Sequence, residues 1–386
     1  MNKLFTLLCL ILLTSCTQLS DTANTAPTNL QHPEIKALGD RLADWQLAHM
    51  DDFSYIRTFQ DHTAWSKGWV QAAFYIGLNR WASRTNNTLY QQAMYEKAQA
   101  NQWELGPLYW HADDQAVAQM YLALPTYGFN IDSVKIQQAF DKILSVAPDN
   151  SLEFFQDKSG KSEGTCQWRW CWCDALFMAP PAWAALSQQT GDERYLEYAI
   201  KEYRATREYL LDKEHSLFYR DSRFFDRVNP NGNKIFWSRG NGWVFAGLPL
   251  LLENMPVEHP AREEFLALYR AMAKTFIGIQ TAEGYYSSSL LDFDNNPPKE
   301  TSGTAFITFG LAWGLNNGIL QAEEYKQSVQ RSWALLSSSV NNEGMLTWVQ
   351  QVGFAPDSVL ESDTQLYGSG AFLLAASEML ALKNAY

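Results

Sequence analysis

The stretch at 165–183, which reads TCQWRWCWCDALFMAPPAW, brings together side chains that could do chemistry on a sugar. Trp168, Trp170 and Trp172 occupy alternate positions, and a single carboxylate, Asp174, follows directly. Indole rings stack on the apolar faces of pyranoses, and a carboxyl group can move protons. The stretch therefore predicts a carbohydrate site with Asp174 as its acid.

Four more polar motifs stand at the start of apolar segments: HADD at 111–114, WSRGNGW at 237–243, ETSGT at 300–304 and DTQ at 363–365. Asp, Ser and Thr also favour helix N-caps, so capping is the competing interpretation of these positions. It applies to Asp114, Asp174, Ser238, Thr301 and Asp363. We prefer capping for Thr301 and Asp363, and chemistry for Asp174, which lies among tryptophans.

The elements that must position these motifs are helices of two alternating kinds. Charged, amphipathic helices are expected at 33–49, 87–103, 130–145, 192–213, 260–279 and 323–340. Apolar helices rich in Gly and Ala are expected at 65–83, 112–127, 174–190, 239–254, 301–318 and 364–382. Short β-like segments at 217–220, 284–287 and 345–348 precede apolar helices.

A helix that is apolar on all sides must be buried by its neighbours. Six apolar helices inside six charged ones predict an all-α fold, an (α/α)6 toroid of six helical hairpins with short β-hairpin insertions. An open α-solenoid is the alternative, but no polar capping repeat is visible. In a closed toroid the N-termini of the inner helices converge at one end, where the polar motifs would meet.

Composition excludes some partners. The net charge is −12, and no basic stripe exists to neutralise the phosphates of a nucleic acid. An anionic sugar would need local cations, for which the candidates are Arg169, Arg223, Arg227, Lys234 and Arg239. The six histidines are scattered without metal-ligand spacing, so we expect no metal and no cofactor.

The N-terminus reads as a targeting segment. Lys3 precedes an apolar stretch, and Leu13-Thr14-Ser15-Cys16 resembles a lipobox in which Cys16 is lipidated. Thr17 favours the outer membrane, and a plain secretory signal is the alternative. We expect a signal peptide at 1–16, a polar tether at 17–32 and one catalytic domain at 33–386.

Three cysteines remain in the expected mature domain: Cys166, Cys171 and Cys173. A periplasmic setting permits disulfides, but an odd count leaves at least one thiol free. A catalytic cysteine–histidine pair is disfavoured, because Cys171 and Cys173 flank Trp172 and look like packing residues.

The motifs together resemble the unsaturated uronyl hydrolases of glycoside hydrolase families 88 and 105, and family 105 more closely. The resemblance lies in HADDQAVAQMYL, WCWCDALFMAPPAW, FWSRGNGWVFAGL, ETSGTAFITFGLAWGL and DTQLYGSGAFLLAASEM, in family order. It implies an (α/α)6 barrel. The implied substrate is an oligosaccharide left by a polysaccharide lyase, with a 4,5-unsaturated uronate at its non-reducing end.

The resemblance also implies roles for individual residues. Asp174 would protonate C4 and activate the water that adds at C5. Asp114, with Asp113 as the less favoured neighbour, would orient the substrate. Arg239 would bind the uronate carboxylate, unless it forms a structural ion pair with Glu300 or Asp363. The further substrate-binding candidates are Trp65, His111, Trp172, Trp237, Trp243 and Thr304.

The aglycone is expected to be rhamnose, from rhamnogalacturonan or ulvan, and WCWCDALFMAPP is more like the ulvan-acting branch. Arg169, Arg223 or Arg227 could bind a sulfate, with loops 214–236 and 284–299 shaping that subsite. Two other functions remain open: an (α/α)6 lyase or epimerase, and a noncatalytic glycan-binding surface lipoprotein. The few histidines argue against the lyase and the epimerase.

Overall fold

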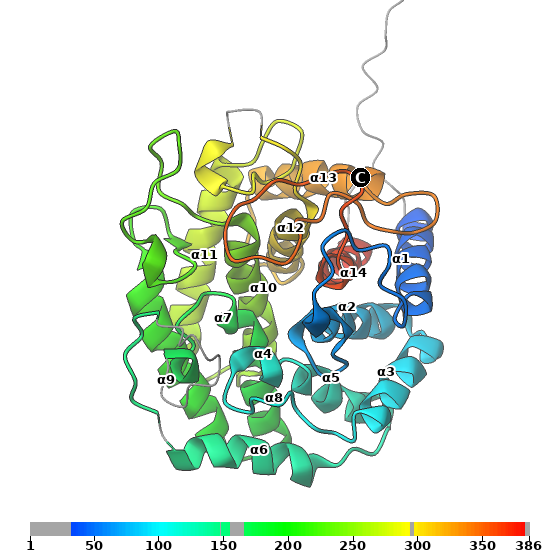
Figure 1. The fold of residues 1–386 in the computed structure, drawn as a ribbon, viewed down its shortest axis with the longest axis vertical. Coiled ribbons are helices and arrows are strands. Elements are labelled where there is room, and N and C mark those ends of the chain that lie inside the picture. Colours follow the sequence, from blue (N-terminus) through cyan, green and yellow to red (C-terminus); the bar gives the residue numbers. More distant parts are fainter. Residues whose placement is uncertain (1–31, 147, 155–165, 294–296, 383–386) are drawn as a thin grey trace, which may run out of the picture.

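The computed structural model describes residues 32–146, 148–154, 166–293 and 297–382. Six inner helical units form a ring, and six outer helices surround it (Figure 1). The outer helices are α1 (His32–Ala48), α3 (Thr88–Ala100), α6 (Ser133–Val146), α9 (Glu193–Leu210), α11 (Arg262–Gly278) and α13 (Glu323–Ser338). The inner units are α2 (Trp69–Thr85), α4 with α5 (Ala112–Gln115, Ala118–Ala123), α7 with α8 (Ala175–Met178, Pro180–Thr190), α10 (Ser238–Asn254), α12 (Thr301–Asn316) and α14 (Leu366–Ala381). The predicted helical toroid is confirmed.

The ring closes where α14 packs against α2. A Cβ atom on Gly77 would lie 2.1 Å from the carbonyl oxygen of Gly370, and one on Gly370 would lie 2.2 Å from that of Ala73. Only glycine permits this backbone approach. The closure that distinguishes a toroid from an open solenoid therefore depends on Gly77 and Gly370.

Two of the inner helices are broken, which the sequence did not predict. The expected helix at 112–127 divides into α4, α5 and a 3-10 turn at Leu124–Tyr127. The expected helix at 174–190 divides at Ala179, directly before Pro180. Proline has no backbone N–H to donate to the carbonyl four residues earlier, so Pro180 and Pro181 interrupt the hydrogen bonds of the helix, which accounts for the second break.

Of the three β-like segments, only the first forms a strand. β2 (Leu217–Phe218) pairs antiparallel with β1 (Leu211–Asp212). Close to the second segment, Ser289 forms an isolated bridge with Trp237. In the third segment, Leu346 forms an isolated bridge with Val340.

The preferred capping assignments for Thr301 and Asp363 are wrong. Glu300 caps α12, and its carboxylate accepts hydrogen bonds from the backbone N–H groups of Ser302 and Gly303. Asp363 instead accepts two hydrogen bonds from Arg57, at 2.6 and 2.8 Å.

The predicted signal peptide, Cys16 and the tether up to residue 31 lie outside the described residues, and α1 begins at His32, one residue before the expected helix. Within the described ranges, no helix combines the length and apolarity needed to cross a membrane. The boundaries of the domain stay a prediction.

Candidate active site

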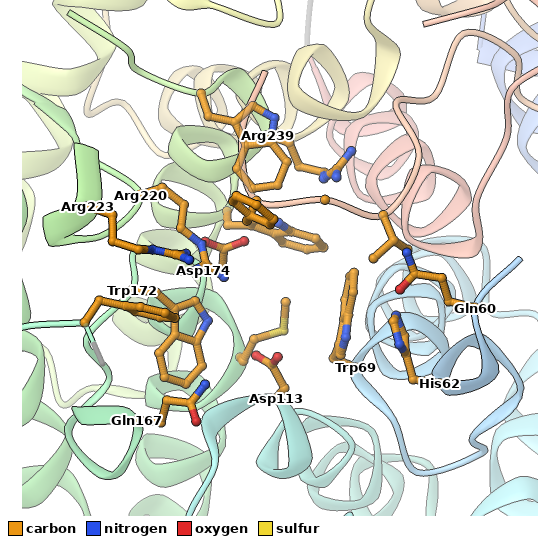
Figure 2. Close-up of a pocket in the computed structure, with 17 residues that line it drawn as sticks. Gln60, His62, Trp69, Asp113, Gln167, Trp172, Asp174, Arg220, Arg223 and Arg239 are labelled. Atoms are coloured by element: carbon orange, nitrogen blue, oxygen red, sulfur yellow. The ribbon is translucent and has the colours of Figure 1, made fainter. Parts of the chain in front are cut away.

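A cavity of ≈ 370 Å³ opens at the end of the ring where the inner helices begin (Figure 2). Its walls come from the segments around the starts of α2, α4, α7 and α10, from the loop before α14, and from the residues after β2. The lining residues are Gln60, His62, Trp69, Asp113, Phe154, Gln167, Trp172, Asp174, Met178, Arg220, Arg223, Trp237, Arg239, Trp243, Val352, Gly353 and Phe354. Segments distant in sequence thus meet at one cavity, as the toroid requires.

Asp174 stands at the N-cap position of α7, but its side chain makes no capping hydrogen bond. Its Oδ2 atom lies 3.4 Å from Nε of Arg220 and 3.5 Å from Sγ of Cys173. The capping interpretation of Asp174 is therefore wrong, and its carboxylate faces the cavity. Burial raises the pKa of the Cys173 thiol well above its ordinary value, so this free cysteine is not a nucleophile at neutral pH.

The second carboxylate of the cavity is Asp113, whereas the sequence favoured Asp114. Burial, with added repulsion from Asp174 and Asp114, raises the pKa of Asp113 to about 8. Its buried Oδ1 atom has no hydrogen-bond partner among the described residues. Asp114 points elsewhere, since its carboxylate packs so closely on Gly106 that a Cβ there would lie 1.8 Å from Oδ1.

Asp113 is held by His111, the N-cap of α4, whose Nδ1 accepts the backbone N–H of Asp113 at 3.3 Å. The His111 ring lies 4.7 Å from that of Trp172. Burial, helped by the positive charge of Arg220, lowers the pKa of His111 to about 3, so the ring is neutral. His111 supports two lining residues and does not itself line the cavity.

Two arginines after β2 supply positive charge. The buried Asp221 carboxylate accepts hydrogen bonds from Nη1 of Arg220 at 2.7 Å and from Nε and Nη2 of Arg223, both at 2.8 Å. Although burial opposes it, these two cations lower the pKa of Asp221. Asp221 thus stays ionised and fixes both guanidinium groups at the cavity wall.

Arg239 lines the cavity but serves chiefly as a structural group. It is fully buried, and Nη1 and Nη2 donate to the carbonyl oxygens of Gln350 and Gln351 at 2.7 and 2.9 Å. Its guanidinium also lies over the rings of Trp237 and Tyr367, 4.4 and 4.7 Å from their centroids. Neither proposed ion-pair partner, Glu300 or Asp363, is bonded to it. These two hydrogen bonds occupy one N–H of each Nη atom, so Arg239 holds the segment of Gln350 and Gln351 in place.

The other predicted residues divide into two groups. Trp172, Trp237 and Trp243 line the cavity as predicted. Trp65 is 53% exposed outside it, and Thr304 is buried, donating to the carbonyl of Glu300 and accepting from the backbone N–H of Tyr286. Neither Trp65 nor Thr304 lines this cavity, and their predicted roles in substrate binding stay predictions.

Sequence reasoning did not single out several lining residues, notably Gln60, His62, Trp69 and Arg220. Unpaired polar atoms identify some of them. Nε2 of His62 and Nε of Arg220 are buried without a hydrogen-bond partner among the described residues, as is Nε of Arg239, which the sequence did predict. Because these atoms belong to residues that line the cavity, they can bond to a ligand that enters it.

One group of possible metal ligands occurs in the described part of the chain: Asp212, Glu214 and His215. Nζ of Lys234 donates to Asp212 at 2.7 Å and to Glu214 at 3.1 Å. The lysine already supplies a cation to this cluster, so we assign no metal to it.

The helical ring and its cavity of aspartates, arginines and tryptophans define the class of protein. Residues 38–383 match glycosyl hydrolase family 88, and the chain belongs to that family. The finer placement nearer family 105 stays a prediction.

Three relatives make the likeness concrete. An unsaturated 3S-rhamnoglycuronyl hydrolase of Alteromonas sp. (strain LOR) is 44% identical and covers 93% of this chain and 89% of its own. A solved family 88 glycosyl hydrolase from Bacteroides vulgatus has a TM-score of 0.76 at 28% identity, covering 91% of this chain and 99% of its own. A solved structure named a polysaccharide lyase has a TM-score of 0.74 at 28% identity, covering 90% and 97%.

Proposed function

We propose that this glycosidase removes a 4,5-unsaturated uronic acid from the non-reducing end of lyase-generated oligosaccharides. The observation that carries the proposal is the pair Asp113 and Asp174, which point into one cavity from α4 and from the start of α7 (Figure 2). An acid must protonate C4 of the enol ether, and a base must activate the water that adds at C5. The resulting hemiketal opens and releases the neighbouring sugar.

Asp113 supplies a protonated carboxyl group at neutral pH. Its burial and the repulsion from nearby carboxylates favour its neutral form. The pKa of about 8 for Asp113 supports this protonation state. In line with the resemblance of its motif, we assign both proton transfers to Asp174, which gives a proton to C4 and takes one back from the water that adds at C5. We assign the orientation of the substrate to Asp113, which can donate a hydrogen bond in its neutral form.

The charge and shape of the cavity fit an anionic sugar. Arg220 lies beside Asp174, and Arg239 keeps an unpaired Nε–H, so these two buried cations are our candidates for binding the uronate carboxylate. Trp69 and Trp172 lie on opposite sides of Asp113 (Figure 2), where their rings could bound a planar unsaturated sugar.

For the aglycone we propose a sulfated rhamnose of the ulvan type rather than rhamnogalacturonan. The support is the 44% identical relative that is named for a 3S-rhamnoglycuronyl substrate. The arginines of the cavity also favour a sugar with a second anionic group over a neutral sugar, because guanidinium groups bind oxyanions.

Absorbance of the enol ether, followed on unsaturated disaccharides, tests the reaction. The wild-type protein should bleach the band, whereas a lyase would create it on polymer and a binding protein would leave it unchanged. Asp174→Asn should abolish bleaching while substrate still binds. Asp114→Asn is the matched control, because its carboxylate faces Gly106 and turnover should persist. Turnover by the Asp174→Asn variant would refute the assignment.

We also propose that Cys16 is lipidated and anchors the enzyme to the outer membrane, with the lipobox-like motif at 13–16 as support. Palmitate labelling in the bacterium should mark the wild-type protein and not a Cys16→Ser variant. Equal labelling of both would reject the anchor.

A further inference from the structure

Arg223 differs from the other arginines of the cavity in its exposure. It belongs to the 3-10 turn Ser222–Phe224, and 31% of its side chain is exposed, against 15% for Arg220, while Arg239 is fully buried. Because Arg220 lies beside Asp174, the uronate that reaches Asp174 meets Arg220 first. Arg223 is therefore placed nearer the opening, where the neighbouring sugar must lie.

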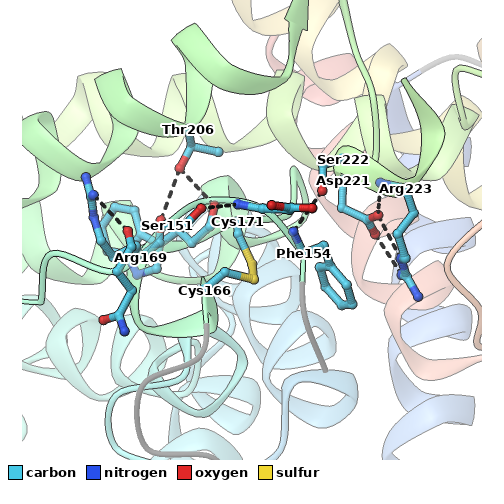
Figure 3. Close-up of a disulfide and its surroundings, with 12 residues drawn as sticks. Ser151, Phe154, Cys166, Arg169, Cys171, Thr206, Asp221, Ser222 and Arg223 are labelled. Atoms are coloured by element: carbon cyan, nitrogen blue, oxygen red, sulfur yellow. Dashed lines mark hydrogen bonds and ion pairs between the residues drawn. A yellow bond between two sulfur atoms is a disulfide. The ribbon is translucent and has the colours of Figure 1, made fainter. Parts of the chain in front are cut away.

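The guanidinium of Arg223 is held between two aromatic rings. It lies 3.9 Å from the ring centroid of Phe154 and 5.0 Å from that of Phe354, and both rings line the cavity. The backbone N–H of Phe154 donates to Oγ of Ser222 at 2.8 Å, which ties this ring to the same turn (Figure 3).

Asp221 fixes the guanidinium from behind. Its carboxylate caps the turn through the backbone N–H of Arg223 at 3.0 Å and accepts Nε and Nη2 of the same residue. Among the described residues, Nη1 of Arg223 has no bonded partner. A cation that is already oriented, with one free edge, binds an oxyanion with little loss of conformational entropy.

The other sequence candidates for a sulfate site do not share this arrangement. Nε of Arg169 pairs with the buried Glu202 at 2.9 Å, and its Nη1 donates to the carbonyl of Asn150. Arg227 lies over Phe224 and does not line the cavity.

We propose that Arg223, between Phe154 and Phe354, binds a sulfate ester on the sugar next to the unsaturated uronate and makes the enzyme selective for sulfated oligosaccharides. The inference rests on the proposed function. A guanidinium matches sulfate in its dispersed charge and weak hydration. The two phenylalanine rings offer an apolar surface to the methyl group and C–H face of a 6-deoxy sugar.

The test compares two unsaturated uronyl-rhamnose disaccharides, one sulfated on the rhamnose and its desulfated counterpart, by bleaching of the enol-ether band. Arg223→Met should lower kcat/KM for the sulfated substrate by about 10- to 100-fold, the range expected for a lost charge-assisted hydrogen bond. For the desulfated substrate, kcat/KM should change by less than about threefold, since that substrate offers no sulfate to Arg223 and Asp221 keeps Arg220 as a partner. Arg227→Met, an exposed arginine four residues away, is the matched control and should leave both values unchanged.

The outcomes separate this inference from the function on which it rests. Failure of the wild-type enzyme on both disaccharides would reject the proposed function. Equal losses on both substrates in the Arg223→Met variant, or a retained preference for sulfate, would reject the role of Arg223 alone. Retained turnover of the desulfated substrate shows that the variant is folded. If the Arg223→Met variant loses turnover of the desulfated substrate, the Arg223→Lys variant, which keeps the charge, must restore that turnover together with part of the preference for the sulfated substrate. Failure to do so would reject the role of Arg223.

Discussion

At the scale of the residue, the protonation of Asp113 makes stability depend on pH. Its pKa of about 8 in the folded protein lies above the ordinary value of 3.8. The folded protein therefore holds a proton that the unfolded chain has lost between about pH 4 and pH 8, and the free energy of unfolding falls as pH rises through that window. An asparagine cannot ionise, so Asp113→Asn removes this contribution.

We compare the melting temperature of Asp113→Asn with that of the wild-type protein at pH 5 and at pH 8. The variant should gain a few degrees relative to the wild type between pH 5 and pH 8, at about 2–4 °C per kcal/mol. Thermal melts at the two pH values measure it. The same variant should lose about 100-fold or more in kcat. A difference in melting temperature that is independent of pH would contradict the assigned protonation.

The sequence did not assign residues correctly where the rotation of a helix about its axis decides which side chain faces the cavity. Asp113 and Asp114 both follow His111, and the motif alone does not show which carboxylate turns toward the ring axis. Trp65 was expected in the cavity, and the first inner helix was expected to begin at this residue. It begins four residues later, and Trp69 lines the cavity instead.

At the scale of the element, a disulfide shapes one wall of the cavity. Cys166 and Cys171 close a short loop that carries Gln167, a lining residue (Figure 3). Next to it, Trp168 stacks on Trp110 with ring centroids 5.1 Å apart. The disulfide thus fixes the two ends of the loop, and the stacking of Trp168 on Trp110 fixes its middle.

Replacing both cysteines, Cys166→Ser with Cys171→Ser, should lower the free energy of unfolding by about 2 kcal/mol, as expected for a loop of this length. KM should rise several-fold because Gln167 loses its fixed position, while kcat changes less because Asp174 lies outside the loop. Denaturant melts and steady-state kinetics measure the two effects. Reductant should affect the wild-type protein in the same way and leave the double variant unaltered; an unchanged KM would show that the loop does not position substrate.

The helices were predictable from sequence, since periodicity and alternation record which faces are buried. α9, expected at 192–213, runs over Glu193–Leu210, and α10, expected at 239–254, runs over Ser238–Asn254. The turn that presents Arg220 and Arg223 was not predictable in this way. Its geometry depends on Asp221, a buried carboxylate that no periodic pattern identifies.

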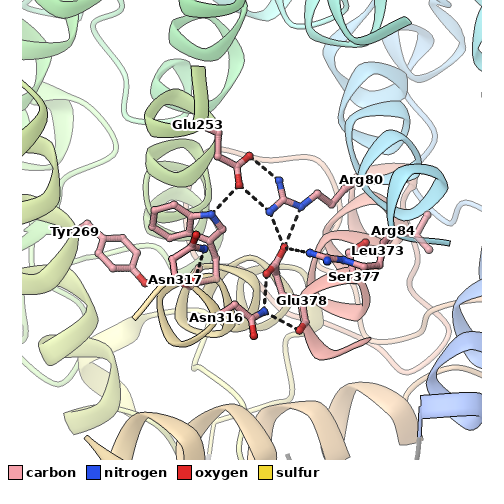
Figure 4. A network of polar contacts seen from close by, with 11 residues as sticks. Arg80, Arg84, Glu253, Tyr269, Asn316, Asn317, Leu373, Ser377 and Glu378 are labelled. Carbon is pink, nitrogen blue, oxygen red and sulfur yellow. Dashed lines mark hydrogen bonds and ion pairs between the residues drawn. The ribbon is translucent and has the colours of Figure 1, made fainter. Parts of the chain in front are cut away.

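At the scale of the whole molecule, a charged network closes the end of the ring opposite the cavity (Figure 4). Arg80 of α2 donates to Glu253 of α10 at 2.6 and 2.8 Å and to Glu378 of α14 at 3.0 and 2.6 Å. Asn316 of α12 donates to Glu378 at 2.7 Å. One guanidinium thus joins three inner helices, near the ends of α10 and α14 that carry partial negative charge.

Arg80→Met should therefore destabilise the fold without harming catalysis. Glu378 is 1% exposed and would lose its main cation, which costs about 3 kcal/mol for a buried pair broken on one side. Adding Glu378→Met should recover part of the loss, because no buried charge then lacks a partner. Lys36→Met, which breaks the exposed pair with Asp40, is the control and should cost at most about 1 kcal/mol.

Chemical denaturation measures these differences, and kcat/KM at 25 °C should stay unchanged in all three variants because the substrate cavity lies at the other end of the inner helices. If Arg80→Met lowered kcat/KM without lowering stability, the network would be coupled to the active site rather than closing the ring. If the second substitution deepened the loss, Glu378 would be stabilised without Arg80, by Asn316 and by Arg84 at 3.5 Å. The recovery in the double variant thus decides whether the charge of Arg80, rather than its packing, joins the ring at this end.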